Sequence, residues 1–113
     1  MYAKIILIGN LGDNPELKFL SDGKPVCNFR MATNRKWKDG EEVTWWRVAV
    51  FGPQAEPCNQ YLSKGSRVLV EAESVKADAW LKKDGEPTAT LEVVARSVQF
   101  LSGKSQDTEQ VPF

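Results

Sequence analysis

One segment constrains the fold of this chain more than any other: Glu42-Val43-Thr44-Trp45-Trp46-Arg47-Val48-Ala49-Val50-Phe51-Gly52. Its β-branched and aromatic residues favour a β-strand, in which successive side chains point to opposite sides. The side chains then divide between two faces: Thr44, Trp46, Val48 and Val50 on one, and Val43, Trp45, Arg47, Ala49 and Phe51 on the other. The first face is mostly apolar and predicts packing against a core, with Trp46 in the core or in a subunit interface.

The second face spaces two large aromatic rings around a cation, which is unusual for a surface that only meets water. The plane of an aromatic ring can stack on a nucleobase, and an arginine can hold the phosphate beside it. The pattern of Trp45, Arg47 and Phe51 therefore predicts a platform for unpaired nucleic acid.

The rest of the chain alternates in the same way, apart from one short segment of helical spacing. We expect strands over residues 5–8, 26–37, 42–52, 67–75 and 88–101, and a helix over 53–62. The order β-β-β-α-β-β is that of an OB-fold barrel. The predicted fold is all-β: a five-stranded OB-fold barrel over residues 1–102, with one short helix between strands 3 and 4. Residues 103–113 are polar and predict a disordered, flexible tail that ends in the tip Val111-Pro112-Phe113.

Composition limits the chemistry that the chain can perform. It has 113 residues, no histidine, and 15 basic against 15 acidic residues, so phosphate binding must come from local placement of cations. Without histidine, a P-loop or a nucleophile elbow, we expect no enzyme activity, no metal site and no cofactor.

Cys27 and Cys58 stand among apolar neighbours and predict buried free thiols in a reducing compartment. No apolar run is long enough to span a membrane, so a cytoplasmic protein is expected.

Four motifs, in order and at compatible spacing, resemble the bacterial-type single-stranded DNA-binding protein family. They are Ile8-Gly9-Asn10-Leu11-Gly12-Asp13-Asn14-Pro15-Glu16, Ala32-Thr33, Trp45-Trp46-Arg47-Val48-Ala49-Val50-Phe51-Gly52 and Tyr61-Leu62-Ser63-Lys64-Gly65-Ser66. The resemblance covers roughly residues 2–102 and the last few residues. This chain departs from the family pattern in the fourth strand. That strand is often basic in family members, but here it carries Glu71, Glu73 and Asp78.

The resemblance implies DNA-binding roles for particular side chains. Base stacking falls on Trp37, Trp45, Phe51 and Trp80, with the rings expected to lie open to solvent along a shared groove, and phosphate contacts fall on Arg47 and Lys64. Cations near the aromatic residues or in the loops extend the predicted DNA-binding set by Arg35, Lys36, Lys38, Lys76, Lys82 and Lys83.

The resemblance also implies a biological role. It implies sequence-independent binding and protection of single-stranded DNA in replication, recombination and repair. It further implies a homotetramer, or at least a dimer, and recruitment of replication and repair proteins through Val111, Pro112 and Phe113. The protein would act in the cytoplasm at the nucleoid, and the short tail is compatible with a phage or plasmid origin.

Two other functions remain open from the residues. The apolar tip and the acidic fourth strand are compatible with an OB-fold adaptor of the replication and repair machinery, for which DNA binding is secondary. Stacking platforms also bind single-stranded RNA, although the sequence offers no obvious device for the 2′-hydroxyl.

Overall fold

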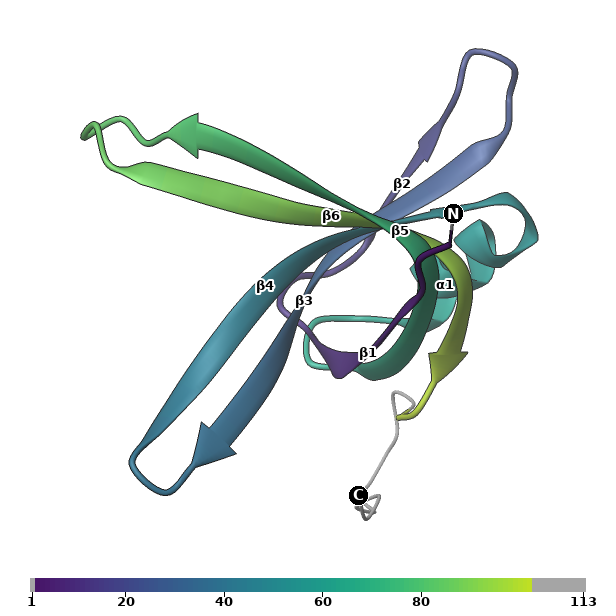
Figure 1. The fold of residues 1–113 in the computed structure, drawn as a ribbon. Helices are drawn as coiled ribbons and strands as arrows, with labels where there is room; N and C mark the ends of the chain where they lie inside the picture. Colours follow the sequence, from purple (N-terminus) through teal and green to yellow (C-terminus); the bar gives the residue numbers. More distant parts are fainter. Residues whose placement is uncertain (1, 103–113) are drawn as a thin grey trace.

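The computed structural model describes residues 2–102, which form a β-barrel with one short helix (Figure 1). The elements, in chain order, are β1 (Ile5–Leu11), β2 (Glu16–Phe19), β3 (Pro25–Trp37), β4 (Gly40–Phe51), a 3₁₀ turn (Gly52–Gln54), α1 (Ala55–Tyr61), β5 (Arg67–Leu81) and β6 (Pro87–Phe100). Val111, Pro112 and Phe113, on which the predicted docking tip rests, lie outside the described residues, as does the rest of the predicted tail.

Five long strands close the barrel in the order β1-β5-β6-β4-β3, and β3 returns to β1 through the pairs Asn10–Ala32 and Leu11–Met31. The β4–β6 pair is parallel and the others are antiparallel. Closure leaves few strand edges without partners. The predicted five-stranded OB-fold, with its helix between the third and fourth barrel strands, is confirmed.

The barrel closes through a very close approach of two backbones at Gly9. A Cβ atom at this position would lie 2.0 Å from the carbonyl oxygen of Ala32, a distance that no side chain tolerates. Gly9 is not among the glycines with positive φ, so its requirement here is for space. The first strand can cross β3 only because residue 9 has no side chain.

β1 continues three residues beyond its expected end, to Leu11, and the largest differences from the expected strands lie in β2 and β5. The four-residue β2 was not predicted: it follows the break at Gly12–Pro15 and pairs with the start of β3, where the isolated sequence is too short and too polar to signal a strand. β5 was expected to end at Val75 but continues to Leu81. Its polar second half becomes a strand because β6 supplies backbone partners as far as Pro87, beyond an irregularity in the ladder between Ala72 and Val75.

The core confirms the alternation predicted for β4. Val48 and Val50 are buried, and Trp46 is half-buried against the core, with its indole N–H donating a hydrogen bond to Thr33 Oγ1 at 3.0 Å. Cys27 and Cys58 are buried free thiols, as predicted. Burial raises the pKa of Cys27 to about 11 and, together with the nearby Cys27, that of Cys58 to about 12, so both thiols stay protonated at neutral pH.

The β3–β4 and β5–β6 hairpins extend beyond the barrel as diverging arms (Figure 1). The β3–β4 arm turns between Trp37 and Gly40, and the β5–β6 arm turns between Leu81 and Pro87. Among residues 2–102, none of the helical segments has the length and apolar character needed to cross a membrane.

Candidate nucleic-acid interface

Strand register places predicted binding residues of β4 and β5 on one outer face of the sheet, together with Arg30 of β3 and Glu92 of β6. Arg47 of β4 pairs with Arg30 of β3 on one side and with Glu92 of β6 on the other, and Glu92 pairs with Lys76 of β5. Residues directly opposite each other in a ladder point to the same side. We call this surface the aromatic face, because the same alternation places Trp45, Phe51 and Trp80 on it.

The three rings of the aromatic face are open to solvent. Trp45 and Phe51 are each 46% exposed and Trp80 is 50% exposed. The Trp80 indole N–H donates a hydrogen bond to Thr90 Oγ1 at 3.0 Å, which orients the ring on the β5–β6 arm. The predicted exposure of these rings is confirmed.

A hollow of about 180 Å³ brings two of the rings together between the arms. It is lined by Arg30, Trp45, Trp46, Arg47, Trp80, Ala89 and Thr90. Two further hollows, of about 280 and 250 Å³, also include Arg47 in their walls. The first adds Asp13, Asn14, Glu16, Asn28, Phe29 and Arg30, and the second adds Asn28, Ala49, Ser74, Lys76, Glu92, Val93 and Val94. Together these three hollows form the Arg47 groove.

The arginines of the Arg47 groove already have carboxylate partners. Arg30 pairs with Asp13 at 2.8 Å, and Arg47 pairs with Glu92 at 3.4 Å. The Arg30 guanidinium also lies 4.9 Å from the centroid of the Trp45 ring, within range of a cation–π interaction. A phosphate that enters the groove would therefore compete with internal carboxylates for these cations.

Trp37 does not share the groove with Trp45. In β3 the residues opposite Trp45 and Arg47 have even numbers, so Trp37 points to the other side of the strand. Trp37 pairs with Gly40, and Arg35, on the same side, pairs with Glu42. The Arg35 guanidinium lies 5.9 Å from the Trp37 ring, so the two share a face. Trp37 is 52% exposed, as expected, but it lies on the opposite face of the β3–β4 arm. The expectation of one shared groove is wrong for Trp37, because strand alternation places it on the other side. Phe51 lies on the aromatic face but lines none of the three hollows, so among the predicted rings only Trp45 and Trp80 line the Arg47 groove.

The remaining predicted cations are spread over the surface. Lys76 lines the Arg47 groove. Lys64 lines none of its hollows, although its backbone N–H donates a hydrogen bond at 2.8 Å to Oδ1 of Asn14, a lining residue. Lys36 lines a separate hollow between β1 and β3, and Lys38, Lys82 and Lys83 are exposed at the tips of the arms.

Comparison with known proteins identifies the family of this chain. Residues 2–101 match the model of the Single-strand binding protein family. The chain belongs to this family.

Similar proteins include "Single-stranded DNA-binding protein 1" of Xylella fastidiosa (strain 9a5c), which is 38% identical over 96% of this chain and 82% of its own length. A single-stranded DNA-binding protein of Wolinella succinogenes is 39% identical over 92% of this chain and 67% of its own length.

Two solved structures resemble the fold. The Plasmodium falciparum SSB in complex with ssDNA has a TM-score of 0.72 and 30% identity, covering 88% of this chain and 95% of that one. A small single-stranded DNA-binding protein from Streptomyces coelicolor has a TM-score of 0.74 over 88% of this chain and 94% of its own. At 18% identity it bears on the fold alone.

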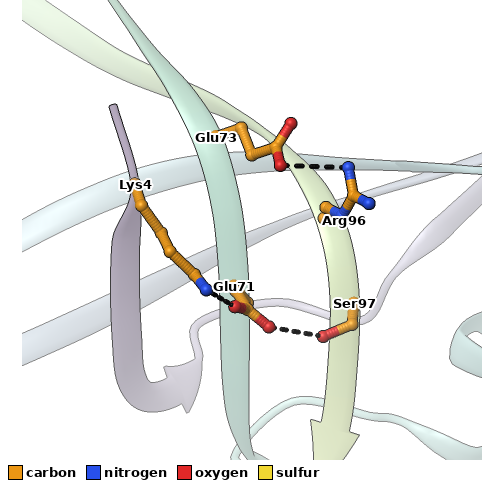
Figure 2. Close-up of polar contacts among 5 residues, drawn as sticks. All are labelled: Lys4, Glu71, Glu73, Arg96 and Ser97. Carbon is orange, nitrogen blue, oxygen red and sulfur yellow. Dashed lines mark hydrogen bonds and ion pairs between the residues drawn. The ribbon is translucent and has the colours of Figure 1, made fainter. Parts of the chain in front are cut away.

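Two of the three acidic residues of β5, Glu71 and Glu73, form ion pairs with basic neighbours. Figure 2 shows Glu71 between Lys4, with which it forms an ion pair, and Ser97, whose hydroxyl donates a hydrogen bond at 3.4 Å. The ammonium group of Lys4 lowers the pKa of Glu71. Glu73 pairs with Arg96 at 3.0 Å. The departure from a basic strand therefore adds little uncompensated negative charge at these two positions.

Arg30 was not among the residues predicted from the sequence to bind DNA. Its outward orientation was readable, because it alternates with the apolar Phe29 and Met31 of the same strand. Its place beside Trp45 was not readable, because that depends on the register between β3 and β4 and on the position of Asp13.

Proposed function

We propose that this protein binds single-stranded DNA without sequence preference. The observation that carries the proposal is the hollow in which Trp45 and Trp80 face the same space as Arg30 and Arg47. Each ring can stack on a base, and each guanidinium can hold a phosphate. Every base has a π-face, so stacking does not discriminate between sequences.

The same geometry favours unpaired over duplex DNA. In a duplex the faces of the bases are covered by their neighbours, and an exposed indole cannot reach them. The related Plasmodium falciparum protein was solved in complex with ssDNA, which supports the proposal for this chain. We further propose that binding protects single strands during replication, recombination and repair, in the cytoplasm at the nucleoid.

The proposal predicts a large loss of affinity when Trp45 is truncated. Trp45→Ala should weaken binding of oligo(dT) by about 1–3 kcal/mol, the usual contribution of one stacked base. The measurement is a titration of intrinsic fluorescence, with duplex DNA and a matched RNA oligomer as competitors.

Tyr61→Ala is the matched control, since Tyr61 is 52% exposed but lies on α1 beside Phe100 and does not line the Arg47 groove. Unchanged affinity of Trp45→Ala would remove this ring from the platform. Tighter binding of the RNA would favour an RNA-binding role.

Release of Arg47 from its internal partner should strengthen binding. Glu92→Gln removes the carboxylate at 3.4 Å from Arg47 and leaves the cation available to a phosphate. Because exposed pairs contribute about 0.2–1 kcal/mol, affinity should rise by up to about fivefold. The slope of log K against log salt should steepen by up to about 0.7, the value for one additional phosphate contact.

Glu56→Gln is the control for net charge. Glu56 lies in the first turn of α1 and lines none of the hollows of the Arg47 groove. If both variants raise affinity equally, the effect comes from overall charge and the Arg47–Glu92 pair does not regulate binding.

We also propose that the protein assembles into a homotetramer, with a dimer as the smaller alternative. Ile6 and Ile8 of β1 are 57% and 37% exposed, and residues 5–9 of this strand pair with β5 on one edge only within the described structure. An apolar strand with a free edge favours pairing with another chain.

Sedimentation equilibrium should show a smaller mass for Ile6→Lys than for the wild type. It should show an unchanged mass for Leu81→Lys, which alters an exposed residue at the end of an arm. A monomeric wild type would contradict the assembly.

The last proposal concerns Val111, Pro112 and Phe113, which lie outside the described residues. An apolar segment of this kind can dock into a partner's groove, so we propose that it recruits replication and repair proteins. Deletion of the three residues should leave the affinity for oligo(dT) unchanged or slightly higher and abolish partner binding in pull-down experiments. Partners that still bind would show that the tip is dispensable.

A further inference from the structure

Gly12, at the end of the first barrel strand, lies directly against the Trp45 ring. A Cβ atom at residue 12 would lie 2.4 Å from Cζ3 and 2.7 Å from Cη2 of Trp45. Gly12 is not one of the glycines with positive φ, so its backbone conformation does not require glycine. The indole occupies the space that a side chain at residue 12 would take, so a larger residue here would require the Trp45 ring to move.

The backbone of Gly12 is held in place by β3. Its N–H donates a hydrogen bond to the carbonyl oxygen of Arg30 at 2.9 Å. The bend after β1 is therefore attached to β3. This strand pairs with β4, and its residue Ala32 lies opposite Trp45 of β4. On the Gly12 side the contact is therefore fixed by backbone, and on the other side it is made by the ring of the Trp45 side chain.

The neighbouring side chains complete the surroundings of the ring. The Arg30 guanidinium lies 4.9 Å from the Trp45 centroid. Asp13 accepts a hydrogen bond from Arg30 Nε at 2.9 Å and pairs with Nη2 at 2.8 Å, which holds the guanidinium at the ring. Trp45 nevertheless remains 46% exposed. Gly12, Asp13 and Arg30 thus restrict the indole and still leave it accessible.

We propose that Gly12, with Asp13 and Arg30, positions Trp45 for stacking on a base. A ring that is already restricted loses less conformational freedom when a base stacks on it, so binding is stronger. Gly12 is a positioning residue that acts through Trp45 without contacting DNA through a side chain of its own. This inference rests on the proposed binding of single-stranded DNA.

A double-mutant cycle tests this role. Gly12→Ala should weaken binding of oligo(dT) at least about fivefold in the wild-type background, and by no more than Trp45→Ala does. In the Trp45→Ala background the same substitution should change affinity less than about twofold, because the added methyl group no longer meets an indole. Equal weakening in both backgrounds would overturn the proposal, since Gly12 would then act independently of Trp45.

A second readout does not require DNA. The chain has four tryptophans, and the indole N–H resonance of Trp45 can be assigned by its absence from the NMR spectrum of Trp45→Phe. Gly12→Ala should shift this resonance more than the other three. An unmoved Trp45 resonance would overturn the proposal. If wild-type protein fails to bind oligo(dT), the proposed function fails, while this measurement still decides whether Gly12 positions the ring.

Gly23→Ala is the matched glycine control. Gly23 has a φ of +88°, and a methyl group added there would meet no heavy atom within 4 Å, so alanine introduces backbone strain without a steric clash. It should lower the melting temperature without changing affinity or the Trp45 resonance.

If Gly12→Ala does not fold, the double variant Gly12→Ala/Trp45→Ala should restore folding because the clash is removed. A double variant that still fails to fold would overturn the proposal.

Discussion

The architecture depends on the contact between the backbones of β1 and β3 at Gly9. A side chain there would collide with the carbonyl oxygen of Ala32, so the barrel closes only with glycine. The same contact sets β1 against the strand that pairs with β4. Three residues further on, Gly12 meets the ring of Trp45. Closure of the barrel and placement of the central aromatic ring are therefore two consequences of one motif, Gly9-Asn10-Leu11-Gly12.

Charge in this protein is balanced locally as well as overall. Arg30 and Arg47 face the groove with Asp13 and Glu92 as partners, and Glu71 and Glu73 are paired elsewhere on the barrel. Exposed pairs of this kind contribute little to stability, but they compete with any phosphate that approaches. Under the proposed function, affinity would then depend more on stacking than on electrostatic attraction, and internal carboxylates would set how much each arginine contributes.

Much of the fold was predictable because the strongest signals are local. The outward Trp45 and the inward Trp46 follow from alternation along one strand, and the short helix follows from its change in period. The four-residue β2 and the second half of β5 were not predictable, because their sequences are polar and they become strands only through pairing with β3 and β6. Arg30 was missed for a related reason: its importance comes from neighbours in other strands.

The sequence by itself determined which residues could lie on the same side of each strand, since that depends only on the alternation of the backbone. Tertiary structure alone decided which strands' faces meet. Trp45 and Trp80 share a hollow although 35 positions separate their numbers in the chain, whereas Trp37, much nearer in sequence, lies on the opposite face of its arm. The physical reason is that barrel closure and hydrogen-bond register join distant segments, and neither is encoded in any one segment.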